Sequence, residues 1–500
     1  MRDSRTNSLT RVLVAGLVLA LWLGLLLPSL DRSRLQNVDE LWHARAAQAA
    51  TLDGHWWPLV LDGRPFFEKP PLVLWLAAAT AKASGQPFAA WPYRLWNTLG
   101  GALALAAILG LGALAGRFWG GVFAAVLLGL QGDFVYHSRF FTMDTPFLGL
   151  GLLAALGMAA ALGVEKRAGL WWLAGLSLAL AFWCKSWFVL ALAPALGAAL
   201  LSALPEGQRL PALGRLALPL LLAVLAWLAL YTAWSGLGFL KQEWHDNLLG
   251  RLQGSGNAWT WSGHWDFYED WVQRAAPAML PLFLGVPLGL WPRRQDSAAV
   301  NFIRVFAWVL PLSWLLGLAL VHGETLNYVL PLEAGLALCL GLGLGDPQPP
   351  SARAALAALL LLSALSIGKQ VPDGLAFIGG GALGLVIAWS RWRGDKLPAQ
   401  RDWILAAAAG LLLFMLCPDA VGLCLRPLDA HRVLAPFLLA HEPERPGETL
   451  WAVDVPTWGV DFYTRYHVLH VKTLAEAKPG EAVLINGPQG LRLIPAPKAP

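Results

Sequence analysis

Charged residues are scarce in this 500-residue chain. They make up 14% of it, whereas an ordinary soluble domain is about one quarter charged. So small a charged fraction excludes a typical water-soluble globular protein and indicates lipid as the solvent of much of the chain.

Cysteine is also rare, and the four residues are Cys184, Cys339, Cys417 and Cys424. None forms a close metal-ligating pair. We therefore expect buried free thiols, with a Cys417–Cys424 disulfide as the open alternative.

The positive charge lacks the arrangement that nucleic-acid binding requires. The formal net charge is +5, but the Arg and Lys residues lie in short loops between apolar runs, where they orient a membrane protein. No basic stripe interleaves with aromatic residues, as a nucleic-acid site would need. Internal repeats and long low-complexity linkers are absent as well. We therefore expect membrane lipids, and no nucleic acid, as partners.

Long apolar runs are the dominant feature of the sequence. Hydrophobic residues make up 57% of the chain, and its 27 Trp suit membrane interfaces. The first run resembles a signal peptide, but no small-x-small cleavage site follows it, so we expect a retained helix. Runs near the ~20 residues of a spanning helix predict about 13 transmembrane helices. They lie at residues 12–30, 97–116, 118–132, 146–163, 168–183, 187–204, 214–236, 275–291, 302–321, 326–344, 353–368, 374–390 and 403–424. Residues 72–84 form a further span or a helix along the membrane surface.

The basic residues alternate between loops in a way that predicts orientation. If the N-terminus is cytoplasmic, every second loop should be basic. The residues of these loops are Arg2, Arg5 and Arg11; Arg117; Lys166 and Arg167; Arg209 and Arg215; Arg293 and Arg294; Arg353; and Arg391, Arg393, Lys396 and Arg401. The opposite, outer side then holds the long loops 31–96 and 237–274, the segment 133–145 and the tail.

The sequence therefore predicts an all-α polytopic membrane protein with a small external domain. We expect a transmembrane domain over residues 1–424 and a small α/β domain over residues 425–500. In the tail, residues 450–455 and 482–485 are typical of short strands, separated by a helix and by Gly and Pro turns.

Two motifs of the first outer loop carry candidate functional groups. Asp39 and Glu40 are either solvated loop charges or acids tuned for general base catalysis. Glu68 and Lys69 precede two prolines, which restrict the backbone. This second motif is either a stiff entry into a helix or a turn that presents both charges to a ligand.

Three further motifs lie on the same side of the predicted membrane. Arg139 and Asp144, at the mouth of a span, either pair with each other or bind an anion and an acceptor, since Arg suits phosphate. Lys185 lies between two apolar runs, where a charge either snorkels or is functional. Tyr328 is an interface anchor or a site residue. Carboxylates and cations beside lipid suit a substrate with a phosphate and a long apolar tail.

Taken in chain order, these motifs resemble a known family. The set comprises Asp39-Glu40, Glu68-Lys69-Pro70-Pro71, Arg139 to Asp144, Lys185 and Tyr328 to Pro331. It resembles the bacterial aminoarabinose transferase and protein O-mannosyltransferase superfamily, which are GT-C-type glycosyltransferases similar to glycosyltransferase family 39. The resemblance covers roughly residues 10–345. It implies a GT-C-like fold in the bacterial inner membrane, with the active site facing the periplasm.

The resemblance also implies a reaction and residue roles. A sugar moves from a polyprenyl (undecaprenyl) phosphate to an envelope acceptor, with inversion at the anomeric carbon. Asp39 is then the general base or a group that orients the acceptor, and Asp144 is a second catalytic acid that positions donor or acceptor. Lys69, Arg139 and Lys185 stabilise the leaving phosphate. Glu40, Glu68 and Tyr328 are further substrate-binding candidates.

Several points stay open at the level of sequence. Many relatives carry Lys shortly before the Tyr-x-Leu-Pro motif, whereas this chain has Glu324. The sugar, whether hexose or pentose, and the acceptor, whether lipid A, another glycan or protein, are not identified. Some GT-C enzymes use a divalent cation, which favours carboxylate oxygens; no metal ligand is assigned here. The alternatives to a transferase are a transporter or flippase of a lipid-linked or anionic substrate, and a structural or sensor protein.

Overall fold

The chain is mostly helical. The computed structural model describes residues 2–33, 35, 38–61, 63–163, 168–236, 238–239, 271, 296–320, 326–345, 440–441, 448–453, 462, 467–471, 473–479, 481–487 and 490–495. The helices are α1 (Arg2–Leu26), η1 (Leu27–Ser29), α2 (Val38–Leu52), α3 (Leu72–Ser84), α4 (Trp91–Leu114), α5 (Phe118–Gly129), α6 (Gly132–Arg139), α7 (Asp144–Gly163), α8 (Ala168–Lys185), η2 (Ser186–Leu192), α9 (Ala193–Ala203), α10 (Glu206–Ser235), α14 (Ala298–Leu320), η4 (Leu326–Val329) and α15 (Leu330–Gly345), where η marks a 3-10 helix.

Membrane-spanning helices account for most of the described residues. Six helical stretches are long and apolar enough to cross a membrane, and a bent pair brings the number to seven. This confirms a multi-pass protein, although the described residues do not reach the predicted 13 helices. The predicted spans at 275–291, 353–368, 374–390 and 403–424 lie outside the described residues. Helix α3 is apolar but only 13 residues long, which is short for a bilayer crossing.

One predicted span differs in the structure. We expected a helix over 118–132 followed by an outer loop, whereas α5 ends at Gly129 and α6 begins at Gly132, with a 68° bend between them. Gln131 between them is extended. Two glycines beside the break explain it, because glycine destabilises a helix interior relative to alanine. The bend turns α6 so that Arg139 and the residues after it lie at one end of the bundle.

The stretch Ala168–Ala203 is 36 residues long and is broken at the predicted outer turn. Helix α8 ends at Lys185, and Ser186 has a positive φ of 55°, which a non-glycine residue rarely adopts. The two halves pack on different neighbours: α8 lies against α7 and α10, and α9 lies against α14. The break therefore places Lys185 at the mouth of the bundle.

Small residues allow the central helices to approach closely. A Cβ at Gly100 on α4 would overlap the backbone of Pro146 on α7, and one at Gly149 would overlap the carbonyl of Gly100. Helix α5 crosses α15 in the same way, at Gly120 and Gly341. Small residues at such contacts are typical of helix packing in membranes. The close approach of α4 and α7 determines where the segment between α6 and α7 lies.

The C-terminal strands form a mixed four-stranded sheet. The strands are β3 (Thr449–Val453), β4 (His467–Val471), β5 (Ala482–Gly487) and β6 (Gly490–Pro495), in the order β4-β3-β5-β6. β3 runs parallel to β4 and β5, and β6 pairs antiparallel with β5. The predicted strands at 450–455 and 482–485 match β3 and β5. Between these strands the described residues include the 3-10 helix η6 (Leu474–Glu476) and a further 3-10 residue, Phe462, but no α-helix.

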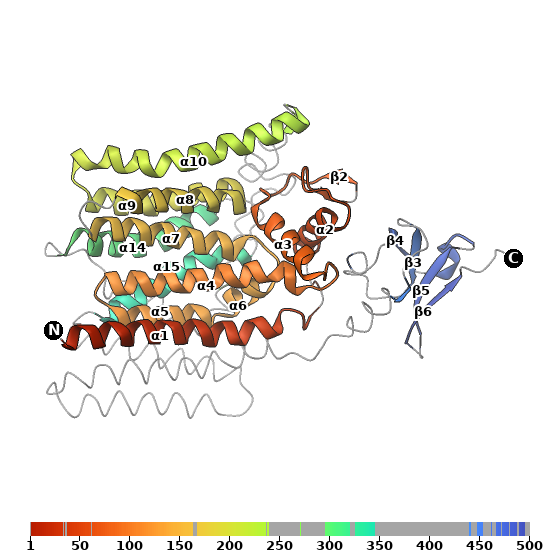
Figure 1. The fold of residues 1–500 in the computed structure, drawn as a ribbon, viewed down its shortest axis with the longest axis horizontal. Helices are drawn as coiled ribbons and strands as arrows, with labels where there is room; N and C mark the ends of the chain where they lie inside the picture. The colour runs from red at the N-terminus through yellow and green to blue at the C-terminus, as the bar shows by residue number, and fades with distance from the viewer. Residues whose placement is uncertain are drawn as a thin grey trace, which may run out of the picture.

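The two ends of the bundle differ in the material they carry (Figure 1). The N-terminus, the α4–α5 junction with Arg117 and the α9–α10 junction lie at one end. Helices α2 and α3, the small hairpin of β1 (Val60–Leu61) and β2 (Arg64–Pro65), and the C-terminal sheet lie at the other. The basic junctions and the candidate site residues thus lie at opposite ends, as the loop charges predict. Cys184 and Cys339 are buried and free, and the other two cysteines lie outside the described residues.

Candidate active site

Helix α2 presents the first two candidate acids on different sides. Its alanine-rich sequence has high helix propensity, and its first turn contains Asp39 and Glu40. Asp39 is exposed, near the positive end of the helix dipole, where an anion is stabilised. Glu40 is fully buried. Neighbouring residues on a helix point about 100° apart, so one acid faces outward while the other faces the protein.

Glu40 anchors four segments to one another. Its Oε1 accepts from Arg94 Nε at 2.7 Å and from the Phe141 backbone N–H at 2.9 Å, and its Oε2 accepts from Arg94 Nη2 at 3.0 Å. Arg94 Nη1 also donates to the carbonyls of Leu30 and Ser33, each at 2.7 Å. The pair joins α2, α4, the end of α1 and the α6–α7 connection. This geometry makes Glu40 a structural anchor, whereas the sequence suggested a substrate contact.

Asp144 and Lys185 form a second buried ion pair. The Lys185 Nζ contacts Asp144 Oδ1, and the two side chains are 7% and 4% exposed. The same Nζ lies 4.3 Å from the centroid of the Phe188 ring and 4.5 Å from that of Tyr328. Within the described residues Lys185 has no hydrogen-bond partner besides Asp144. An ammonium with three donors is therefore held by one carboxylate and two ring faces.

Hydrogen bonds from α4 fix the segment that carries Asp144. Asn97 Nδ2 donates to the Thr142 carbonyl and, at 3.3 Å, to that of His137. Thr98 Oγ1 donates to the Ser138 carbonyl at 2.7 Å, and Thr145 Oγ1 donates to the Asn97 carbonyl at 2.8 Å. Buried polar groups of α4 thus satisfy the backbone where α6 ends and α7 begins.

The first loop brings Lys69 toward the site. The Lys69 carbonyl accepts from Tyr231 Oη on α10 at 3.4 Å, and the neighbouring Phe67 ring packs on those of Tyr231, Trp234 and Phe239. Aromatic packing therefore holds this turn against α10. Lys69 is half-buried, whereas Glu68 is exposed.

The pKa of His43, on α2, shows that the other charged groups lie close to one another. Burial and, after it, the positive charge of Lys69 lower the pKa of His43 to about 4, against the opposing effects of the negative charges of Asp39 and Asp144. Those three charges therefore all act on one ring. Arg139 is buried on α6, donates to the Ser29 carbonyl at 3.1 Å and lies under the Phe140 ring. Asp39, Lys69, Asp144, Lys185 and Tyr328 thus lie around one region, in which Asp39 is exposed and the others are buried or half-buried.

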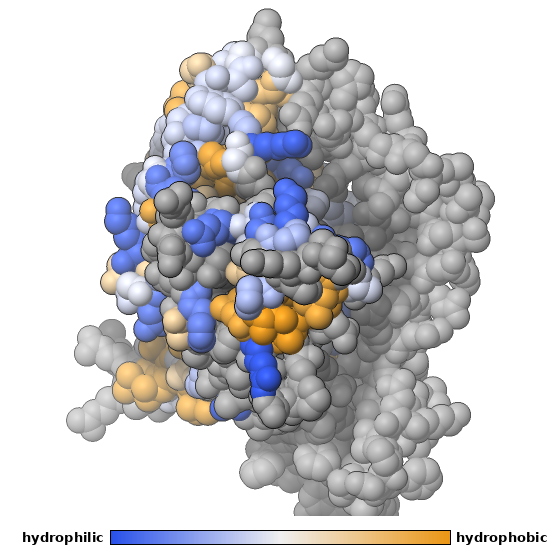
Figure 2. Space-filling model, turned by 90° about the vertical axis from the view of Figure 1, so that its right-hand side faces the viewer, coloured by the Kyte–Doolittle hydropathy of each residue, from blue (hydrophilic) through white to orange (hydrophobic). Residues whose placement is uncertain are grey.

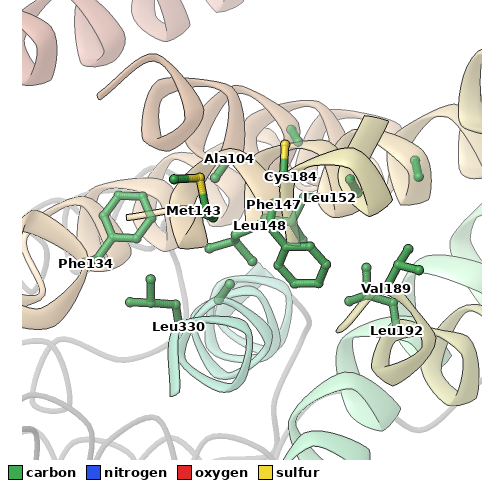
Figure 3. Close-up of a cluster of buried hydrophobic side chains, with 14 of the residues drawn as sticks. Ala104, Phe134, Met143, Phe147, Leu148, Leu152, Cys184, Val189, Leu192 and Leu330 are labelled. Carbon is green, nitrogen blue, oxygen red and sulfur yellow. The ribbon is translucent and has the colours of Figure 1, made fainter. Parts of the chain in front are cut away.

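A buried apolar cluster adjoins the Asp144–Lys185 pair in sequence. Met143 and Cys184, which directly precede the two charged residues, belong to this cluster together with Phe147, Leu148 and Leu330 (Figure 3). Each member of the pair is therefore preceded in the chain by a side chain that packs in buried hydrocarbon. Figure 2 views the molecule from this end and shows hydrophilic residues spread around a central hydrophobic group.

Sequence reasoning missed three contributors: Arg94, His43 and Phe188. Arg94 follows Pro92 in the first turn of α4, a usual place for proline. A charge just inside an apolar helix is a signal for a buried partner. His43 lies one turn after Asp39, which is the signal that it shares a helix face with that acid.

Among the described residues, no group of three His, Cys, Asp or Glu could hold a metal ion. Glu324 lies outside the described residues.

Comparisons with known proteins bear on the family and the fold. Residues 68–240 match the sequence family described as dolichyl-phosphate-mannose-protein mannosyltransferase. No curated protein matches the sequence.

Solved structures have the same fold. ArnT from Cupriavidus metallidurans bound to undecaprenyl phosphate superposes with a TM-score of 0.63 at 18% identity, covering 91% of this chain and 85% of that one. Its apo form gives 0.60 at 20% identity with the same coverage. The archaeal oligosaccharyltransferase AglB from Archaeoglobus fulgidus, in complex with an inhibitory peptide and a dolichol-phosphate, gives 0.53 at 12% identity, covering 92% and 64%. These findings confirm the resemblance to GT-C-type glycosyltransferases.

Proposed function

We propose that this chain transfers a sugar from a polyprenyl (undecaprenyl) phosphate to an acceptor of the bacterial envelope. The observation that carries the proposal is the buried Asp144–Lys185 pair, whose ammonium lies against two aromatic rings and whose sequence neighbours Met143 and Cys184 belong to a buried apolar cluster. A phosphate with a long apolar tail would meet a cation and hydrocarbon at the same point. The family match over residues 68–240 and the ArnT structure bound to undecaprenyl phosphate support this donor class.

The proposed reaction is a single displacement. The acceptor hydroxyl oxygen attacks the anomeric carbon, and a new carbon–oxygen bond forms as the bond to the phosphate oxygen breaks. The electron pair leaves with the phosphate, and Asp39 receives the hydroxyl proton. Attack opposite the leaving group inverts the anomeric centre. Asp39 is exposed at the start of α2, where it is accessible to an acceptor.

The cations have the task of stabilising the departing phosphate. Lys185 holds donors that its protein partners do not use, so phosphate oxygens can take the place of Asp144 around it. Lys69, whose charge acts on His43, adds positive charge in the same region, and Arg139, buried at the end of α6, is the third cation that we assign to the phosphate. Preorganised charge aimed at a developing anion is among the largest catalytic effects. Asp144, released from Lys185, then positions donor or acceptor.

The alternating loop charges support a location in the inner membrane, with the site on the periplasmic side. We further propose that residues 1–424 form the catalytic domain and residues 425–500 a periplasmic domain. Lipid A is the acceptor we favour, and other glycans or protein Ser/Thr groups are the alternatives. A divalent cation is not required by this scheme, because Lys and Arg neutralise the phosphate.

Reconstituted protein with a labelled undecaprenyl-phosphate sugar and lipid A tests the proposal. We expect label to appear on the acceptor, and Asp39→Asn to lower the rate by roughly 10²–10⁴-fold, the range of general base catalysis. Asp31→Asn, in the same loop, is the matched control. Sugar transfer at the normal rate by Asp39→Asn would disprove the base role. Movement of the lipid-linked sugar across the vesicle membrane without transfer would instead support a flippase.

Two further measurements identify the products and the metal requirement. Mass spectrometry of envelope lipids and glycans with and without the gene should show loss of one pentose or hexose increment. Addition of a chelator to the transfer assay should leave the rate unchanged. A rate lost to the chelator and restored by a divalent cation would require a metal in the mechanism.

A further inference from the structure

We propose that His43 is a substrate-binding residue of this site, whose Nε2 accepts a hydrogen bond from a hydroxyl of the transferred sugar or of the acceptor. The inference rests on the proposed function and adds a residue to it. It follows from where the ring lies, which nitrogen is already bonded and which charges surround it.

The His43 ring lies at the meeting point of the three segments that carry the site charges. It is one helical turn after Asp39, and 3% of the residue is exposed. The Phe66 ring contacts it edge-on at 5.9 Å between centroids, and the Phe141 ring does so at 6.1 Å. Phe66 is three residues before Lys69, and Phe141 is three residues before Asp144. The ring therefore lies among the base, a phosphate cation and the second acid.

The hydrogen bond of His43 determines which nitrogen faces the substrate. Nδ1 lies 3.4 Å from the carbonyl oxygen of Phe141, and a carbonyl only accepts, so Nδ1 carries the proton. In a neutral imidazole, Nε2 then has the lone pair. Among the described residues none donates a hydrogen bond to Nε2. The tautomer is assigned from this bond, and it leaves one acceptor available for a hydroxyl.

Burial, with the charge of Lys69, keeps the ring neutral. Burial, followed by the charge of Lys69, lowers the His43 pKa to about 4, against the opposing effects of Asp39 and Asp144. At neutral pH the ring therefore accepts a hydrogen bond at Nε2 and does not add a cation next to Lys69. This role is distinct from that of Asp39, which takes up the proton of the attacking hydroxyl.

Two amide substitutions separate the two ring nitrogens. The side-chain nitrogen of Asn can occupy the position of Nδ1 and keep the Phe141 bond, whereas the Gln amide reaches the position of Nε2. We expect His43→Asn to keep the wild-type melting temperature but to lower kcat/KM roughly 10- to 100-fold, the range of one lost hydrogen bond in a buried site. His43→Gln should retain kcat/KM within about fivefold. A rise in KM for the donor identifies a sugar hydroxyl, and a rise in KM for the acceptor identifies an acceptor hydroxyl.

Each result decides the inference. Transfer by His43→Asn at the wild-type rate overturns it, as does a Gln variant that folds and is as impaired as the Asn variant. If the Gln variant does not fold, the Asn variant decides alone. The Asn defect should be equal from pH 5.5 to 8.5; a defect confined to low pH would mean that a charged ring acts, which contradicts a neutral acceptor. If wild-type protein transfers no sugar, the proposed function itself fails and this inference with it.

Discussion

Two buried ion pairs at the same end of the molecule are bonded in opposite ways. In Glu40–Arg94, three hydrogen bonds reach the carboxylate from Arg94 and the Phe141 backbone, and the guanidinium also bonds two backbone carbonyls. In Asp144–Lys185, the ammonium has one hydrogen-bond partner among the described residues, and ring faces cover the rest. The first pair is saturated by the protein, whereas the second retains donors for a ligand.

This difference separates a structural role from a functional one. Arg presents a planar fork that bonds several acceptors at once, while Lys is a compact charge with rotatable donors. A saturated pair has nothing left for a substrate, and its bonds join segments far apart in the chain. A cation held by one carboxylate can exchange that partner for a phosphate without leaving backbone groups unpaired. The two pairs should therefore respond differently to the same kind of substitution.

The largest expected effect is the loss of unfolding free energy when the Glu40–Arg94 pair is broken. Arg94→Met leaves a buried carboxylate and the Leu30 and Ser33 carbonyls without their donors, which should cost about 3–5 kcal/mol of unfolding free energy. Titration of purified protein in mixed micelles with SDS measures this loss. Arg94→Lys is the control: it keeps the charge but not the fork, so its loss should be smaller. If Arg94→Met is as stable as wild type, the structural role assigned to this pair is wrong.

The second prediction removes each pair without leaving a charge behind. Asp144→Asn/Lys185→Met should have a free energy of unfolding within about 1 kcal/mol of wild type, because Lys185 donates to no backbone carbonyl among the described residues. Its sugar transfer should fall roughly 10²–10³-fold, the range for removing one electrostatic stabiliser. The matched Glu40→Gln/Arg94→Met variant should be clearly destabilised, since it still leaves buried backbone groups unpaired. Equal losses of stability in the two double variants would contradict the assignment of a structural role to Glu40–Arg94 alone.

A smaller effect should follow from removing one ring of the lysine cage. Tyr328→Leu abolishes one cation–π contact of Lys185, which is worth about 0.5–2 kcal/mol, so transfer should slow roughly 2- to 30-fold. Tyr328→Phe retains the ring and should be close to wild type in kcat/KM. A large defect in Tyr328→Phe would assign function to the hydroxyl, as a direct substrate contact, in place of the ring.

Asp144 and Lys185 could each be singled out from the sequence because each borders an apolar run, but their pairing was not predicted. Lys185 between two hydrophobic stretches predicted an outer turn, and α8 does end there. Asp144 at the mouth of a span was recognised for the same reason. Local hydropathy is sufficient where a charge lies beside lipid, since such a charge is costly unless it is used.

The structural pair and the His43 site could not be predicted in this way. Glu40 and Arg94 are 54 residues apart, and His43 and Phe141 are 98 apart, so their contacts depend on how α2, α4 and the α6–α7 connection pack. The sequence paired Arg139 with Asp144 as one option, but Lys185 is the partner that the fold supplies. Strands β4 and β6, which pair with the predicted strands β3 and β5, were not predicted from the sequence.

Gln48 extends the comparison to a neutral contact, for which we expect the smallest effect. Its Nε2 donates to the Phe462 carbonyl at 2.8 Å and to the Pro87 carbonyl at 3.0 Å, and the Phe462 ring packs edge-on against Tyr93 at 5.3 Å. Gln48→Ala removes these bonds without leaving a buried charge unpaired. It should therefore lower the free energy of local opening around Phe462 by about 0.5–1.5 kcal/mol. We expect faster amide exchange and proteolysis around Phe462, with the SDS unfolding midpoint nearly unchanged. Tyr93→Leu, which keeps Gln48 but removes the ring contact, should add to this loosening. A loss of stability as large as that of Arg94→Met would show that the contact with the C-terminal segment, and not only the ion pair, secures α2.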